Sequence, residues 1–282
     1  MTKTEIKEFL LSSHNLIPSH LKISNLNWKN LCCTVLEGGN VLIKGESGGG
    51  KTLTTKTLKQ IFPNREFISI PMSAAQDARS TLIGNAHFKD GTFFKQSAFT
   101  QAIQIPNTII ILEEVNRSHK DIDNILSTVL DPLQKFLRID DDVNIPVINV
   151  ADGVSFIATA NIGRKYTSTR AMDFSFTERF VEFEMDTLDF QTEYDLSVSL
   201  FSDIDEKIIK QICEIADYTR ELYFGLDSDL TRYISTKLVH KFLSRIDTGA
   251  FTFDEALKSI IYPKFENDDL NIIKLKVQSY ET

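Results

Sequence analysis

The residues best suited to chemistry form a glycine-rich loop between an apolar run and a helical stretch. The loop Gly45-Glu46-Ser47-Gly48-Gly49-Gly50-Lys51-Thr52 matches the pattern G-x-x-x-x-G-K-[ST] without a gap. Glycines adopt positive φ, so successive N–H groups can converge on an anion, and the N-terminus of the following helix favours phosphate. Lys51 would reach the β- and γ-phosphates, and the Thr52 hydroxyl would be one ligand of Mg²⁺. We predict a triphosphate site; a glycine-rich turn without a ligand is the alternative.

A second candidate pair ends the apolar run Thr108–Leu112. Glu113 and Glu114 follow this run directly. A buried parallel strand ends at the carboxyl edge of its sheet, where ligands bind in open α/β folds, and successive residues point to opposite sides. The two carboxylates can therefore divide the work, one supporting Mg²⁺ and the other polarising the attacking water. A solvated acidic strand end is the alternative.

Two later strand-like runs carry polar residues at their ends. Asn161 follows the run Val154–Ala158, and its amide can donate and accept, so it can hold the lytic water and sense the γ-phosphate. Arg179 precedes the run Phe180–Phe183 and can serve as an arginine finger in a neighbouring subunit's site. An asparagine in a turn and a solvated edge arginine are the respective alternatives.

The elements that must position these residues alternate between short apolar runs and helical patterns. Such alternation predicts an α/β fold, a P-loop NTPase three-layer sandwich with a parallel sheet. The apolar stripe 122–133, after a Ser118 cap, indicates a helix. A hairpin is expected between Leu137 and Val150, with Asp140–Asp142 as a solvated tip rather than a metal site. The expected strands are Val41–Ile43, Phe67–Ile70, Thr108–Leu112, Val154–Ala158 and Phe180–Phe183.

The character of the sequence changes after about residue 186. Strand-like runs fade and helical stripes dominate, among them 208–216, 238–243 and 256–261. We predict an α/β domain over 1–186, with a short N-terminal helix around Phe9, and a smaller all-helical lid domain over 187–282.

Composition limits the class of protein. The 31 Lys+Arg and 39 Asp+Glu residues give a net charge of -8, which disfavours a broadly basic nucleic-acid binder. No apolar stretch is long enough to span a membrane, and the start lacks the apolar core of a signal peptide. The three cysteines do not form a disulfide framework, so free thiols in a cytoplasmic protein are expected.

Together, the motifs resemble the AAA+ ATPases, and among them the MoxR and dynein-related clade. Its members carry a P-loop, an acidic strand end followed by I-N-R, then A-T-x-N, then a D-R-F finger. The matching segments here, which extend the resemblance over nearly the whole chain, are Gly45–Thr52, Glu113–Arg117, Ala158–Asn161 and Glu178–Phe180. The stretch 157–163 looks closest to the cobaltochelatase CobS-like branch.

This resemblance implies a role for each matched residue. The family has a helical lid with a sensor 2 arginine, and the segment Leu230–Leu238 resembles that region. The implied roles are phosphate binding for Lys51, Mg²⁺ support for Thr52 and Glu113, water activation for Glu114, sensor 1 for Asn161, a finger acting on the neighbouring subunit for Arg179, and sensor 2 for Lys237 or Arg232.

Three positions depart from the family pattern. Glu113 and Glu178 stand where aspartate is common, and the longer Glu113 side chain changes the metal geometry. Lys237 stands where arginine is usual and cannot make a bidentate phosphate contact. Because Lys51 and Glu114 are retained, we still expect hydrolysis.

The expected function is that of an ATPase that works in a homo-oligomeric ring, a hexamer by analogy, and remodels a partner. In this clade the partner is often a protein with a von Willebrand A-type domain. No N-K-x-D tetrad occurs, so ATP is favoured over GTP. The alternatives are a nucleic-acid-associated motor or restriction-type NTPase subunit, a monomeric P-loop kinase, and a nucleotide-gated scaffold without useful hydrolysis.

Overall fold

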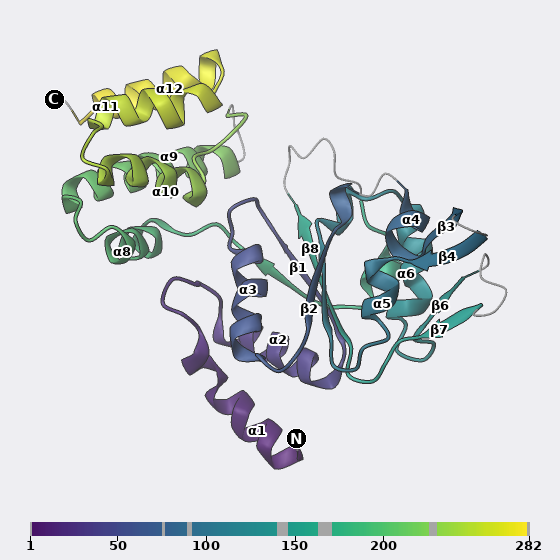
Figure 1. The fold of residues 1–282 in the computed structure, drawn as a ribbon. Helices are drawn as coiled ribbons and strands as arrows, with labels where there is room; N and C mark the ends of the chain where they lie inside the picture. The colour runs from purple at the N-terminus through teal and green to yellow at the C-terminus, as the bar shows by residue number, and fades with distance from the viewer. Residues whose placement is uncertain are drawn as a thin grey trace. The chain divides into compact units, whose positions relative to one another are not determined.

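A computed structural model describes residues 2–74, 77–88, 92–139, 146–162, 171–225 and 230–280 (Figure 1). The chain divides into two compact units. The first comprises Met1–Glu46 and Gly50–Met185, and the second comprises Ser47–Gly49 and Asp186–Thr282.

The first unit is built on a parallel five-stranded sheet, as the sequence predicts. The strand order is β2-β5-β8-β1-β9, and every neighbouring pair is parallel. All seven residues of β8 are buried, since this strand lies inside the sheet. The strands are β1 (Asn40–Gly45), β2 (Phe67–Pro71), β5 (Ile109–Glu113), β8 (Ser155–Asn161) and β9 (Val181–Met185).

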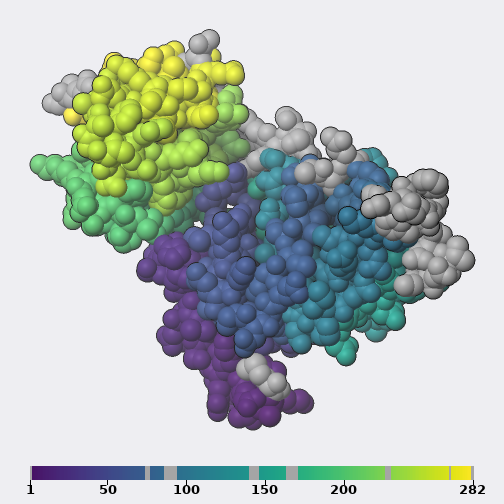
Figure 2. All heavy atoms as spheres, viewed as in Figure 1, coloured from purple at the N-terminus to yellow at the C-terminus, as the bar shows by residue number. Residues whose placement is uncertain are grey.

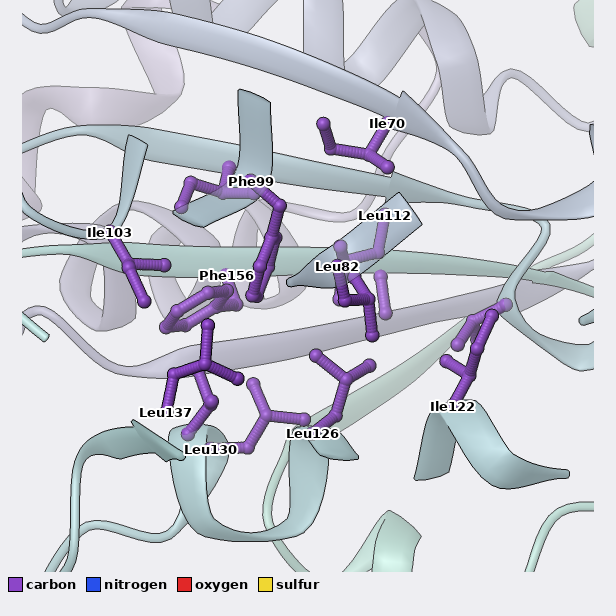
Figure 3. Packing of buried hydrophobic residues seen from close by; sticks show 14 of the residues in the cluster. Ile70, Leu82, Phe99, Ile103, Leu112, Ile122, Leu126, Leu130, Leu137 and Phe156 are labelled. Atoms are coloured by element: carbon purple, nitrogen blue, oxygen red, sulfur yellow. The ribbon is translucent and has the colours of Figure 1, made fainter. Parts of the chain in front are cut away.

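Helices cover both faces of this sheet, because alternate strand residues point to opposite sides. Val41 and Ile43 belong to a core cluster shared with α2 and α3, whereas Leu42 belongs to a second cluster shared with α4, α5 and α6. Figure 3 shows part of the second cluster, in which Phe99 and Phe156 lie near Leu126. The three-layer fold is therefore confirmed. The helices are α2 (Asn25–Glu37), α3 (Lys51–Ile61), α4 (Ala78–Leu82), α5 (Ala98–Ala102) and α6 (Asp121–Leu130).

Helix α6 is shorter than its apolar pattern predicts. The helix is preceded by Lys120 rather than capped by Ser118, whose hydroxyl donates to the Val115 carbonyl. At the other end the helix stops at Leu130, and Leu133 is 93% exposed instead of continuing the buried stripe. Pro132 lies between them and cannot extend a helix, which explains the early end.

Two antiparallel strand pairs occur in the described part of the first unit besides the main sheet. The pair β6 (Phe136–Arg138) and β7 (Val147–Asn149) is the hairpin that the sequence predicts; its acidic tip, Asp140–Asp142, lies outside the described residues. The pair β3 (Gly84–Phe88) and β4 (Thr92–Gln96) was not expected from the sequence.

The chain enters this unit through an N-terminal helix, α1 (Lys3–Ser12), which was predicted and has no buried residue. In Figure 2 the purple N-terminal segment stands out from the body of the first unit. A short turn, η1 (Ser13–Leu16), follows it. The fully buried Trp28 of α2 fixes this turn, because its indole N–H donates to the Ser13 carbonyl at 2.9 Å.

The second unit is helical and has a core of its own. A buried ion pair joins Arg220 of α9 to Glu193 of α8, with 2.7 Å between Nη2 and Oε1. Arg220 also donates to the carbonyls of Leu188 and Ile234. The elements are α8 (Phe190–Leu200), α9 (Glu206–Phe224), α10 (Thr236–Asp247), α11 (Phe253–Ala256), η4 (Leu257–Ile261), η5 (Tyr262–Lys264) and α12 (Asn267–Gln278).

Among the residues that the structure describes, no helix combines the length and the apolar character needed to cross a bilayer.

Replacing Trp28 should destabilise the first unit. Trp28→Ala removes a fully buried ring and leaves the buried Ser13 carbonyl without its donor, so we expect a loss of about 3–5 kcal/mol in the free energy of unfolding. Urea denaturation followed by circular dichroism measures it. Leu26→Ala, on the same helix but 65% exposed, is the control and should change stability by less than about 0.5 kcal/mol. Equal effects of the two substitutions would contradict this account of the packing.

Candidate nucleotide site

The glycine-rich loop connects β1 to α3, the strand and helix that the sequence predicts on either side of it. Gly45, Gly48 and Gly50 all have positive φ, at 152°, 96° and 88°. At Gly45 no other residue fits, because a Cβ atom would lie 2.2 Å from the Met185 carbonyl oxygen of the paired strand β9. The loop therefore adopts the kind of backbone that turns N–H groups toward an anion.

Lys51 is the first residue of α3, and its side chain folds back under the loop. It is 7% exposed, and its Nζ donates to the carbonyls of Gly45 and Glu46, each at 2.9 Å. Burial lowers the Lys51 pKa from 10.5 to about 8, although the charges of Glu46 and Glu114 oppose this shift. The site thus holds a desolvated cation at a helix N-terminus, which favours a phosphate ligand.

The two glutamates at the end of β5 face different neighbouring strands. Glu113 accepts a hydrogen bond from the Ser69 hydroxyl of β2, with 2.7 Å between Oγ and Oε1. Glu114 accepts from the Asn161 amide of β8, with 2.8 Å between Nδ2 and Oε1. Since β5 lies between β2 and β8, the two carboxylates have different neighbours. Glu114 follows the last residue of β5 and has left-handed backbone angles, so the separation comes from this turn rather than from the alternation of a regular strand.

Thr52 and Glu113 offer the donor chemistry that Mg²⁺ prefers. The Thr52 side chain is exposed at the N-terminus of α3, and Glu113 is half-buried at the end of β5. A hydroxyl and a carboxylate are hard oxygen ligands, and Mg²⁺ usually takes only one or two protein ligands beside phosphates and water. Among the described residues, no three side chains of His, Cys, Asp or Glu form a complete metal cage. The residues therefore fit a magnesium ion held jointly with a nucleotide.

Asn161 brings the acidic strand end and the loop together. It is buried at the end of β8 and pairs in register with Gly45. The next residue, Ile162, donates its backbone N–H to the same Gly45 carbonyl that accepts from Lys51. Lys51, Glu114 and Asn161 are thus gathered at the carboxyl edge of β1, β5 and β8.

Three residues around Glu114 went unassigned in the sequence, although each contacts this site. Arg117 pairs with the Glu114 carboxylate, with 3.1 Å between Nη1 and Oε2. Thr159 accepts from the Glu114 backbone N–H, and Asn116 bonds to the backbone of Asn161. In the sequence, the spacing Glu-x-Asn-Arg could have indicated the contact between Glu114 and Arg117, because residues three apart in a helical turn face each other.

Arg179 lies at the opposite end of the sheet from the loop. It precedes β9, whose register with β1 runs from Val41↔Val181 to Gly45↔Met185. At about 3.3 Å per strand residue, Arg179 is on the order of 20 Å from Gly45. Its guanidinium donates to the carbonyls of Ser127 and Ser175. The structure therefore does not bring Arg179 to the Lys51 site of its own chain.

The two candidate sensor 2 residues belong to the second unit. Lys237 is exposed in the first turn of α10. Arg232 is also exposed, and its Nη1 donates to the Lys264 carbonyl at 3.2 Å. Their roles remain predictions.

Comparison with known families agrees with this geometry. Residues 40–180, half of the chain, match the AAA domain (dynein-related subfamily). The chain therefore belongs to the dynein-related subfamily of AAA domains. Domains of this class are ATPases, which bind ATP and typically Mg²⁺.

Individual relatives cover part of the chain. A protein of Thauera aromatica named "Putative chaperone BssE" is 32% identical over 156 residues, covering 53% of this chain and 51% of its own. The uncharacterized protein SSP1341 of Staphylococcus saprophyticus is 28% identical over 183 residues, covering 63% and 62%. The uncharacterized protein SH1500 of Staphylococcus haemolyticus is 27% identical over 188 residues, covering 65% and 69%. The chain thus spans about half the length of the Thauera protein.

The low Lys51 pKa predicts a pH dependence of nucleotide binding. The free site loses its positive charge as pH rises through about 8, so ATP affinity should fall by more than about tenfold between pH 7.5 and 9.5. Titration with a fluorescent ATP analogue measures this change. Lys51→Arg is the control: its guanidinium stays charged over this range, so any binding it retains should not depend on pH. A flat profile in the unaltered protein would contradict the proposed charge state.

Proposed function

We propose that this protein binds and hydrolyses ATP in an oligomeric ring and uses the energy to remodel a partner protein. The observation that carries the proposal is the gathering of Lys51, Glu114 and Asn161 at one sheet edge. A buried cation at a helix N-terminus suits a triphosphate, and a carboxylate beside an amide suits an attacking water. A scaffold that binds phosphate without hydrolysis would not need the Glu114 carboxylate beside the Asn161 amide.

In the proposed mechanism the loop from Gly45 to Thr52 binds the phosphates through its N–H groups. Lys51 exchanges its carbonyl partners for phosphate oxygens and neutralises charge that develops on the γ-phosphoryl group. Glu114 orients the attacking water and accepts its proton. The Asn161 amide holds the same water and contacts the γ-phosphate. Thr52 and Glu113 would hold Mg²⁺, which would supply further neutralisation of the phosphate charge when bound.

We further propose that Arg179 completes the site of a neighbouring subunit. Two observations support this: Arg179 lies too far along the sheet to reach its own Lys51, and its side chain is only half-buried. On assembly it would leave the Ser127 and Ser175 carbonyls for the neighbour's phosphate. An arginine supplied from outside the site stabilises transition-state charge in many NTPases.

The finer assignment rests on motif resemblance and one relative's name. We propose membership of the MoxR clade near its CobS-like branch, a hexameric ring, and an α/β domain over 1–186 followed by a lid over 187–282 that carries sensor 2 at Lys237 or Arg232. The chaperone name of the Thauera relative supports a client protein, for which a von Willebrand A-type partner is our proposal. The free thiols of Cys32, Cys33 and Cys213 support a cytoplasmic location.

Glu114→Gln should separate ATP binding from hydrolysis. The amide keeps the shape of the side chain but cannot accept the water's proton, so kcat should fall by about 100-fold or more while ATP affinity stays within about threefold. Phosphate release and nucleotide titration measure the two quantities. Lys51→Ala is the companion variant and should lose binding itself. Unchanged turnover in Glu114→Gln would remove Glu114 from its proposed role.

A mixing experiment tests whether Arg179 acts between subunits. Arg179→Ala and Glu114→Gln should each hydrolyse ATP poorly alone. Co-expressed, they should recover part of the wild-type turnover, because some interfaces pair an intact Glu114 with an intact Arg179 from the neighbour. The control mixture of Lys51→Ala with Glu114→Gln should show no recovery, since both changes affect the same site. If the first mixture hydrolyses ATP no faster than the control mixture, Arg179 does not act on the site of a neighbouring subunit.

A further inference from the structure

The short turn that follows Glu114 contacts both residues that we propose to orient the attacking water, Glu114 and Asn161. This turn, η3 (Val115–Arg117), begins directly after Glu114, which has left-handed backbone angles with φ of 55°. Such angles are uncommon outside glycine and mark a position fixed by its surroundings. Here the surroundings include a hydrogen bond from the Glu114 N–H to the Thr159 hydroxyl at 3.0 Å.

Asn116 fixes the position of Asn161 through its backbone. The Asn116 side chain is 3% exposed, its Nδ2 donates to the Asn161 carbonyl at 2.7 Å, and its Oδ1 accepts from the Asn161 N–H at 3.2 Å. The backbone pairing of β5 with β8 ends at Leu112↔Ala158. Three residues further along β8, the Asn116 amide takes the place of a strand partner, so both backbone groups of Asn161 are satisfied in the buried site.

Arg117 fixes the carboxylate of Glu114 from the other side. The Arg117 guanidinium contacts Oε2 at 3.1 Å, while the Asn161 amide contacts Oε1 at 2.8 Å. Within the described part of the chain, each carboxylate oxygen therefore has one partner and keeps a second lone pair that can accept from water. The turn from Glu114 to Arg117 is itself held by a backbone hydrogen bond, in which the Arg117 N–H donates to the Glu114 carbonyl at 2.9 Å.

We propose that Asn116 and Arg117 are positioning residues for ATP hydrolysis: Asn116 acts through Asn161, and Arg117 acts through Glu114. The inference rests on the proposed function of the site. A displacement of about 1 Å in a group that orients the attacking atom can lower the rate by about 100-fold. Neither residue belongs to the glycine-rich loop, so their loss should reduce kcat far more than it changes ATP affinity.

A double-mutant cycle tests the role of Asn116. Asn116→Ala should lower kcat by about 10- to 100-fold with ATP affinity within about twofold of wild type. In an Asn161→Ala background there is no amide left to misplace, so the same change should lower kcat by less than about threefold. If Asn116→Ala does not fold by circular dichroism, Asn116→Ser, which keeps a polar group in the buried position, replaces it. Equal losses in both backgrounds would overturn the role of Asn116.

A charge series tests the role of Arg117. Arg117→Ala should lower kcat by about tenfold, and Arg117→Lys should recover part of it because an ammonium can still contact the carboxylate. In a Glu114→Gln background, Arg117→Ala should have little further effect. Arg245→Ala, at an exposed arginine of α10, is the control and should leave kcat unchanged. Equal turnover in Arg117→Ala and wild type would overturn the role of Arg117.

Wild-type and Glu114→Gln turnover, measured in the same series, separate the two proposals. If the wild-type protein does not hydrolyse ATP, or Glu114→Gln hydrolyses as fast, the proposed function fails and this inference fails with it. If wild type is active and Glu114→Gln is not, while Asn116→Ala and Arg117→Ala both retain wild-type kcat, only the positioning roles are overturned.

Discussion

The burial of the Lys51 ammonium is the constraint around which the first unit is arranged. Taking a charged amine out of water is unfavourable unless nearby dipoles and charges compensate for the lost hydration. Here two loop carbonyls do so directly, and Glu46 and Glu114 do so at longer range. The accepting carbonyls belong to Gly45 and Glu46, in a loop whose glycines Gly45, Gly48 and Gly50 adopt positive φ. The loop conformation therefore compensates for the lost hydration of the buried ammonium.

The strand order decides which side chains share that environment. Because β8 lies between β5 and β1, the end of β8 touches both the acidic strand end and the loop. Asn161 occupies it, in register with Gly45 and bonded to Glu114. Glu113 faces β2 instead and bonds to Ser69. One parallel sheet thus separates two adjacent carboxylates and gives each a different chemical neighbourhood.

The sequence predicts much of this fold, because β-branched runs, the glycine loop and helical stripes are local signals. It predicts less where distant packing decides. The β3–β4 hairpin has few β-branched residues, so its sequence gives only a weak strand signal. Pro132 ends α6 before Leu133, although Leu133 fits the apolar spacing of that helix. At the site, residue types indicated Lys51, Glu114 and Asn161, whose roles stay predictions. The bond from Asn116 to Asn161 joins residues 45 apart in the sequence, and the bond from Arg179 to Ser127 joins residues 52 apart. A local sequence pattern cannot predict such contacts.

The connections of Arg220 give the helical unit a mechanical property. One guanidinium joins Leu188, where the chain enters that unit, to Ile234, just before α10, and it is anchored on the buried Glu193. Breaking a buried ion pair by removing one partner typically costs about 3–5 kcal/mol, so loss of Arg220 or of Glu193 would weaken this junction. Because one side chain bonds to both segments, Leu188 cannot be displaced relative to Ile234 without breaking at least one of these contacts.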